Sequence, residues 1–307
     1  MQIHVEQISA LSGHTAAIYA LEKGFDAHEI ISAGGDGLVV SWNIDAKNHG
    51  KIISKIPDTI FSLLINQSDH EIYVGTLKGG LYKIPLIDNQ KPRLMQFHKK
   101  SIYSLLLHKQ IIIAAGGDGI LSLWNASTFQ LQEAIQLSKF GLRSLCLFEK
   151  ENLIFIGDQA GNLFSCNLQT IKMQHLLQLE TKQSIFSLLL QTHNNYLILG
   201  SRDARIRSVH LTNPTEVNKT TDAHWFTVND LCELDDRLII SASRDKSIRI
   251  WDVDTMQLVH QISADKYPSH KYSVNKLLWM PDDNILLSAG DDKKLLLWKI
   301  ITQHDIE

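Results

Sequence analysis

The sequence has little cysteine and no long hydrophobic run. The three cysteines Cys146, Cys166 and Cys232 are an odd number without a CxxC spacing, so neither a disulfide framework nor a zinc knuckle is expected. We interpret them as reduced core residues. Nowhere do about eighteen apolar residues follow one another, and the opening MQIHVEQIS has neither a basic nor an apolar signal region. We therefore expect no membrane span, no secretory signal and a cytoplasmic location.

The motifs of common enzymes are also missing. The sequence contains no GxSxG, no GxxxxGK[ST] and no HExxH. The paired carboxylates at 235–236 and 282–283 fall between expected strands, where they are interpreted as polar turn residues rather than an acid and base pair. No metal site, cofactor, small-molecule substrate or catalytic residue is predicted.

A repeat of about 42 residues accounts for the whole chain of 307 residues. In segments 30–42, 112–124, 239–251 and 286–298 an aspartate precedes a tryptophan by six residues. Weaker copies at 73–84, 155–166 and 199–209 bring the number of units to seven. The positions equivalent to the aspartate are Asp36, Lys78, Asp118, Ala160, Asp203, Asp245 and Asp292. The chain is therefore expected to be a single domain, 1–307, built from stacked units.

Each unit has the pattern of four short strands. Apolar or alternating runs are separated by Gly, Asp and Asn turns, and no 3.6-residue stripe is long enough for a helix. In the first unit the expected strands are 17–21, 29–33, 38–43 and 51–55. Four-stranded sheets cannot bury both faces alone, and stacking them in a closed ring leaves no exposed inner edge.

The N-terminal segment is expected to close this ring. The last unit ends at its third strand, 294–300, so it lacks a fourth. Residues 7–10 read Gln-Ile-Ser-Ala, as do residues 261–264 in the fourth strand of unit six. We therefore predict that residues 2–11, approximately, supply the fourth strand of the last unit.

A histidine before the turn aspartate, a serine four residues before it and a tryptophan six after it resemble the WD-repeat β-propeller family. The resemblance implies an all-β fold of seven four-stranded antiparallel blades. It also implies a hydrogen-bonded network in each complete unit, made by His14, Ser32, Asp36 and Trp42, by His224, Ser241, Asp245 and Trp251, and by His270, Ser288, Asp292 and Trp298. Unit three keeps His98, Asp118 and Trp124 but has Ala114 in the serine position, and units two, four and five depart further, with Ile84, Cys166 and Val209 in place of tryptophan.

The recurrence of this network favours a structural role. His14, Ser32 and Asp36 superficially resemble a hydrolase triad, but the same trio recurs in units where structure alone explains it. A buried aspartate in a tight turn needs donors, and each hydrogen bond is worth about 1 kcal/mol. We therefore expect these residues to hold the turns together.

The first strands of the seven units point to a binding surface. The residue after the first aliphatic is, in order, Tyr19, Phe61, Tyr103, Arg143, Phe186, Asn229 and Asn275, a set that we call the mouth ring. Strand alternation places these side chains opposite aliphatics that pack between blades, so they should face the mouth of the central channel. The resemblance supports this placement, because this position commonly lines the partner-binding surface of such propellers. Four aromatic rings around one opening favour a contact site over a core role, and Trp225 is expected to extend it.

The loops and turns on the same face carry more bases than acids. The bases are Lys99, Lys100, Lys139, Arg143, Lys182, Arg202, Arg244, Lys246, Lys271 and Lys293, and the acids expected to be exposed are Asp58, Asp158, Asp222 and Asp291. Because the formal net charge of the chain is −3, this face would be locally positive and would favour an acidic or phosphorylated segment.

The sequence thus predicts a non-catalytic scaffold that binds a protein or peptide partner, as a monomer or as a subunit of a hetero-complex. A single-stranded nucleic-acid-binding module stays as an alternative, because bases stack on aromatics beside cations. The near-neutral charge and the lack of Arg/Lys runs argue against it. An enzyme of propeller fold is the other alternative.

Overall fold

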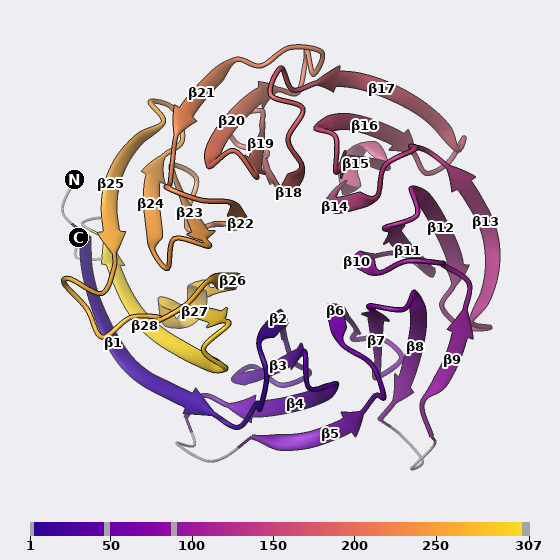
Figure 1. Cartoon of the computed structure of the whole chain (residues 1–307), viewed down its shortest axis with the longest axis horizontal. Coiled ribbons are helices and arrows are strands. Elements are labelled where there is room, and N and C mark those ends of the chain that lie inside the picture. The colour runs from indigo at the N-terminus through magenta and orange to yellow at the C-terminus, as the bar shows by residue number, and fades with distance from the viewer. Residues whose placement is uncertain (1–2, 46–49, 87–90, 303–307) are drawn as a thin grey trace.

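The computed structural model describes residues 3–45, 50–86 and 91–302, and these form seven antiparallel sheets of four strands around a central channel (Figure 1). Blade one, from the channel outward, consists of β2 (Ile18–Lys23), β3 (Glu29–Gly34), β4 (Leu38–Asn43) and β5 (Lys51–Lys55). Blade two consists of β6 (Ile60–Asn66), β7 (Glu71–Thr76), β8 (Gly80–Pro85) and β9 (Arg93–Gln96). Blade three consists of β10 (Ile102–His108), β11 (Ile111–Gly116), β12 (Ile120–Asn125) and β13 (Gln130–Gln136).

The remaining blades repeat this arrangement. Blade four consists of β14 (Leu142–Phe148), β15 (Leu153–Asp158), β16 (Asn162–Asn167) and β17 (Lys172–Gln178). Blade five consists of β18 (Ile185–Gln191), β19 (Tyr196–Ser201), β20 (Arg205–His210) and β21 (Lys219–Asp222). Blade six consists of β22 (Val228–Glu233), β23 (Leu238–Ser243), β24 (Ile248–Asp252) and β25 (Gln257–Ile262).

Blade seven joins the two ends of the chain. Its inner strands are β26 (Val274–Met280), β27 (Ile285–Gly290) and β28 (Lys294–Thr302), and its outer strand is β1 (Ile3–Ser12). β1 runs antiparallel to β28, from Ile3 opposite Thr302 to Ser12 opposite Lys294. This is the position that the sequence indicated for the N-terminal segment, of which residue 2 lies outside the described residues. β28 extends two residues beyond the expected end at 300.

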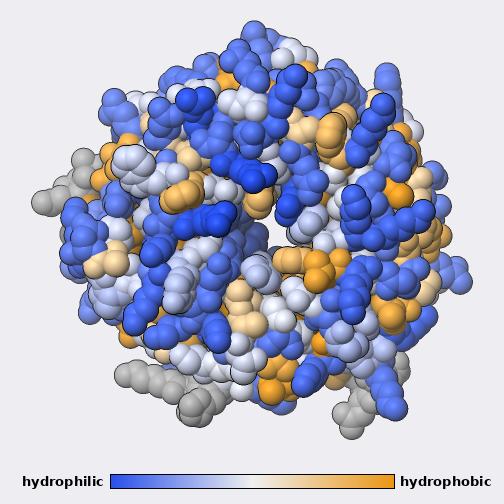
Figure 2. Space-filling view, viewed as in Figure 1, coloured by the Kyte–Doolittle hydropathy of each residue, from blue (hydrophilic) through white to orange (hydrophobic). Residues whose placement is uncertain are grey.

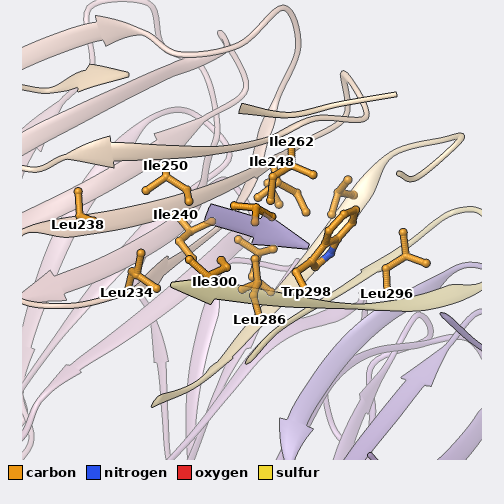
Figure 3. Packing of buried hydrophobic residues seen from close by; sticks show 14 residues of the cluster. Leu234, Leu238, Ile240, Ile248, Ile250, Ile262, Leu286, Leu296, Trp298 and Ile300 are labelled. Carbon is orange, nitrogen blue, oxygen red and sulfur yellow. The ribbon is translucent and has the colours of Figure 1, made fainter. Parts of the chain in front are cut away.

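The core lies between neighbouring blades rather than inside one sheet. Figure 3 shows the cluster between blades six and seven, where Ile240 and Ile250 pack with Trp298 and Ile300. Val5 of β1 belongs to the same cluster, so the first strand contributes to the core as well as to the sheet. Burial of each such aliphatic side chain stabilises the fold by about 2 kcal/mol.

The connections agree with the expected turns. Asp235-Asp236 lies in the turn between β22 and β23, and Asp282-Asp283 lies in a short 3-10 turn, Pro281–Asp283, that leads into β27. A second 3-10 turn spans Glu149–Glu151. The cysteines are free thiols, with Cys166 buried. Within residues 3–45, 50–86 and 91–302 no helix has the length and hydrophobicity to span a bilayer.

Candidate functional site

Three blades contain the predicted four-residue network in full. In blade one, His14 Nδ1 lies 3.0 Å from Asp36 Oδ2 and His14 Nε2 lies 2.8 Å from Ser32 Oγ. The indole Nε1 of Trp42 donates to the same Ser32 hydroxyl at 2.7 Å. Blades six and seven repeat these contacts with the residues named from the sequence.

The network ties each turn to the loop before the first strand of the same blade. Burial lowers the pKa of His14, against the opposing effect of Asp36. A neutral imidazole with its proton on Nδ1 can donate to Asp36 and accept from the Ser32 hydroxyl. Every polar atom of the trio is thus engaged in holding the turn, which supports the structural interpretation over a hydrolase triad.

Blade three uses a serine that the sequence comparison missed. Ala114 occupies the expected position, but His98 Nε2 lies 2.8 Å from Ser122 Oγ, and Trp124 Nε1 donates to that hydroxyl at 2.8 Å. Ser122 lies on β12, directly opposite Ala114 on β11. Because paired positions on adjacent strands place side chains side by side, the hydroxyl reaches the same histidine and indole from the neighbouring strand. The network of blade three is complete.

Blades four and five replace the histidine. In blade four the fully buried Asp158 accepts hydrogen bonds from Ser138 Oγ and from the backbone nitrogens of Ala160 and Asn162. The expectation that Asp158 is exposed was therefore wrong. Ala160 does occupy the position equivalent to the turn aspartate, directly before the positive-φ Gly161, and the carboxylate comes from two residues earlier in the turn.

In blade five the Arg207 guanidinium takes the place of the histidine. It donates to Asp203 at 2.5 and 3.1 Å and to Ser201 Oγ at 2.7 Å. Burial alone would raise the pKa of Asp203, but the hydrogen bonds from Arg207, Ser201 and Thr181 lower it to about 2. The ion pair between Arg207 and Asp203 thus holds the turn of this blade, as the contact between histidine and aspartate does in the complete blades.

The seven mouth-ring side chains line one cavity of about 290 Å³ in the channel. The ring centroids of Tyr19 and Phe61 are 5.0 Å apart, and those of Phe61 and Tyr103 are 5.5 Å apart. The Arg143 guanidinium continues this series, 3.9 Å from the Tyr103 centroid and 4.8 Å from that of Phe186. Five side chains from consecutive blades therefore form a continuous arc. Figure 2 shows the central opening, with hydrophobic and hydrophilic residues at its rim.

The two asparagines complete the mouth ring differently. The Asn229 side chain donates to Ser273 Oγ and to the Val274 carbonyl, and that of Asn275 donates to the Ile18 carbonyl at 3.0 Å. These bonds connect blade six to blade seven and blade seven to blade one. The amides are thus used within the protein, whereas the aromatic rings of the arc have no such bonds to any described residue.

Each mouth-ring residue sits at a β-bulge, which strand alternation had not predicted. In blade one Ile18 pairs with Gly34 and Ala20 pairs with Ala33, so Tyr19 has no partner on β3. The same irregularity occurs at the equivalent residue of the other six first strands. A bulge leaves one residue out of the ladder and redirects its side chain, which explains why all seven side chains face the channel.

Arg143 is positioned to attract an anion. Its faces are covered by two aromatic rings, and within the described residues its buried Nε has no hydrogen-bond partner. Burial lowers the pKa of Arg143, and the charge of nearby Arg202 acts in the same direction. Neither arginine forms an ion pair in the described part of the chain. A negative group placed here would therefore offset both the burial of the Arg143 charge and its repulsion by Arg202.

Below the mouth ring the channel carries charges that sequence reasoning missed. Lys276 Nζ lies 2.9 Å from Asp230 Oδ1, and Glu22 lines the same cavity. Burial raises the pKa of Glu22 to about 7, although Lys276 opposes the shift. The sequence does contain a sign of this buried charge, because Glu22 occupies the position at which units two and three carry Leu64 and Leu106.

Replacing Glu22 is expected to change how stability depends on pH. A carboxyl whose folded pKa is raised contributes stability that is present below the unfolded value of 4.5 and lost as pH rises through about 7. Glu22→Gln should therefore be more stable than the wild type by about 3 kcal/mol at alkaline pH and equal to it in acid. Urea unfolding across pH measures this, with Glu6→Gln on the exposed side of β1 as the control. An equal gain at every pH would contradict a titrating Glu22.

The other predicted binding residues lie on loops of the same face. Arg202 and Arg244 are exposed in the turns between the second and third strands of blades five and six, and their backbone nitrogens donate to Ser184 and Thr227 in the preceding loops. The Trp225 side chain is 82% exposed. Of the ten predicted bases, all but Arg143 are exposed. Asp222 is paired with Arg205, so this acid is partly neutralised.

Three segments of the chain match the profile of a known family. The family profile described as "WD domain, G-beta repeat" matches residues 5–43, 215–252 and 262–299. The chain is 28% identical over 164 residues to mouse "Cilia- and flagella-associated protein 57", covering 39% of this chain and 13% of that protein. It is 25% identical over 199 residues to "WD repeat-containing protein SL1-17" of Schistosoma mansoni, covering 63% of this chain and 65% of that protein. The chain thus spans less than two thirds of either relative's length.

The fold of a solved structure also matches. The WD40 β-propeller domain of Doa1 superposes with a TM-score of 0.83 at 17% identity, over 97% of each chain. The sheet order, the histidine, serine, aspartate and tryptophan networks and the matched repeats agree with one another. The chain is a seven-bladed β-propeller, and three of its segments match the profile of the WD repeat.

Proposed function

We propose that this propeller is a non-catalytic platform that binds an acidic or phosphorylated segment of a partner protein at the mouth ring. Propellers of this family generally mediate interactions between proteins. The observation that carries the proposal is the arc of four aromatic rings and Arg143 around the channel cavity. At about 290 Å³ the cavity is at the small end of the range for small-molecule sites, which suits side chains of a partner.

The closed ring makes this surface rigid. Side chains held in one arrangement before binding lose little entropy when a partner docks. Aromatic and arginine side chains are also the residues that contribute most to binding energy at protein interfaces. The Arg143 guanidinium, whose Nε has no hydrogen-bond partner among the described residues, supplies the attraction for a carboxylate or phosphate.

Phe61→Ala and Phe186→Ala are each expected to abolish partner capture while leaving thermal unfolding nearly unchanged. The reason is that Phe61 and Phe186 are only partly buried and line the cavity rather than a core cluster. Affinity capture from the native host, followed by mass spectrometry and calorimetry, measures both quantities. Leu94→Ala on the outer strand β9, where the side chain is 45% exposed, is the matched control.

The outcomes separate the alternatives. If unfolding falls by several degrees in the phenylalanine variants, these rings belong to the core and the proposal is wrong. Phosphatase treatment of the extract distinguishes a phosphorylated segment from an acidic one. Capture that nuclease removes, with a steep dependence on salt, would favour single-stranded nucleic acid instead.

A further inference from the structure

Three large side chains project from two neighbouring loops beside the mouth ring. Trp225 and Phe226, in the loop before β22, are 82% and 58% exposed, and Tyr272, in the loop before β26, is 59% exposed. We call these three residues the aromatic patch. Large aromatic side chains exposed to this extent are costly in water, and grouped on one face they mark a contact surface.

The hydrogen-bonded network of blade six does not need the Trp225 ring. The residue after the network histidine is Trp225 in blade six, Thr15 in blade one and Lys99 in blade three. In all three blades its backbone nitrogen donates to the turn aspartate, at 3.0, 2.8 and 2.9 Å. Because the same hydrogen bond forms with a threonine, a lysine or a tryptophan, the indole of Trp225 has no role in this network.

The loops that carry the patch are held in place from below. Asp245 accepts from Trp225 N and contacts His224 Nδ1 at 2.9 Å, and Ser243 Oγ donates to the Phe226 carbonyl at 3.2 Å. The rings are therefore presented from a fixed backbone, which reduces the entropy lost on binding.

The loop of Tyr272 is joined to the mouth ring. Ser273, the next residue, accepts from the Asn229 amide at 2.9 Å and donates to Asn275 Oδ1 at 2.9 Å. The loop of Tyr272 is therefore adjacent to the mouth ring, where one segment of a partner could contact both.

Charge indicates which kind of segment fits. Arg244, Lys246 and Lys271 are exposed around the patch, and none of them forms an ion pair in the part of the chain that the structure describes. Of the neighbouring acids, Asp245 is bonded to His224 and Ser247, and Asp222 is paired with Arg205. Asp291 is exposed and accepts a hydrogen bond from the Asn275 amide. The three cations outnumber this one exposed carboxylate, so the surface around the aromatic patch complements an acidic segment.

We propose that the aromatic patch is a second docking surface, which binds an acidic stretch with apolar side chains of the same protein segment that enters the mouth ring. The inference rests on the proposed function and adds the path of the partner, from the channel across blades six and seven. Apolar side chains of the segment cover the three rings, and its carboxylates meet the three cations.

The test starts from peptides selected on the immobilised wild-type protein from a random peptide library. Selected peptides should be enriched in Asp and Glu together with Leu, Ile, Phe and Trp. Their affinity is then measured by fluorescence anisotropy for the double variant Trp225→Thr/Phe226→Ala, which installs the residues that follow His14 in blade one. We expect binding to weaken by about tenfold or more with an unchanged unfolding temperature. Phe61→Ala should abolish it.

Each other outcome decides against the inference. If the double variant binds within about twofold of the wild type while Phe61→Ala abolishes binding, the mouth ring acts alone and the proposed function survives. If neither variant loses affinity, or the wild type selects no peptide, both proposals are wrong. If the wild type binds phosphatidylcholine vesicles containing phosphatidylserine and the double variant does not, the patch contacts a membrane surface rather than a protein.

Discussion

Deleting residues 1–12 is expected to lower the unfolding temperature by about 10 °C or more. β1 supplies the outer strand of blade seven and buries Val5 and Leu11, each 7% exposed, which together contribute about 4 kcal/mol. The deletion also leaves the edge of β28 unpaired, next to the buried Trp298. Circular dichroism during heating and size-exclusion chromatography measure the loss of stability and the association of open edges.

Two controls test whether the strand itself matters. A synthetic peptide of residues 1–13, added to the truncated protein, should restore the unfolding temperature because the pairing with β28 can form between two chains. Within the full chain, Val5→Asp should destabilise strongly and His4→Asp should not, since their side chains point to opposite faces of β1. A truncated protein that melts with the wild type would contradict this account of how the ring closes.

Arg207→Met is expected to destabilise the protein by about 3 to 5 kcal/mol at neutral pH. The Arg207 and Asp203 side chains are 5% and 13% exposed, so the variant leaves a nearly buried carboxylate without its cation. Because the folded pKa of Asp203 is lowered to about 2, the pair contributes stability above the unfolded value of 3.8, and this is lost as pH falls toward 2. The difference between wild type and variant should therefore shrink in acid, as urea unfolding at several pH values can measure.

The neighbouring Arg205 provides a matched control. It pairs with Asp222 at 2.7 Å, but these side chains are 40% and 83% exposed, so Arg205→Met should cost less than about 1 kcal/mol. The double variant Arg207→Met/Asp203→Asn should recover part of the stability, because the uncompensated charge is gone. Equal losses of stability for Arg205→Met and Arg207→Met would mean that burial does not increase what the ion pair contributes to the free energy of unfolding.

The repeat in the sequence predicted the architecture because each unit specifies its own strands and turns. The aspartate and tryptophan spacing located the networks of blades one, six and seven, and the aliphatic before each mouth-ring position located the channel-facing side chains. These features depend on residues close together in the chain, which a pattern within one unit can reveal. The sequence could also place the N-terminal segment, because it repeats the outer strand of unit six.

The substitutions inside the networks could not be found in this way. Ser122 acts from the strand next to the expected one, Asp158 acts from two residues earlier, and Arg207 approaches Asp203 from β20. Each preserves the hydrogen bonds while changing the position that supplies them, so a search at fixed spacing misses it. The exposure of Phe226 and Tyr272 depends on how the loops are held, and the composition of those loops did not indicate it.

The bulges of the inner strands have a consequence for how this surface can vary. A residue outside the ladder can be exchanged without shifting the register of its neighbours, because no cross-strand pair depends on it. Five of these positions, those of the arc, lie outside the ladder and outside the bonds between blades that Asn229 and Asn275 make. On the proposed function, substitutions there would change the surface offered to a partner without shifting the strand register, which makes this rim suitable for evolving or designing new specificities.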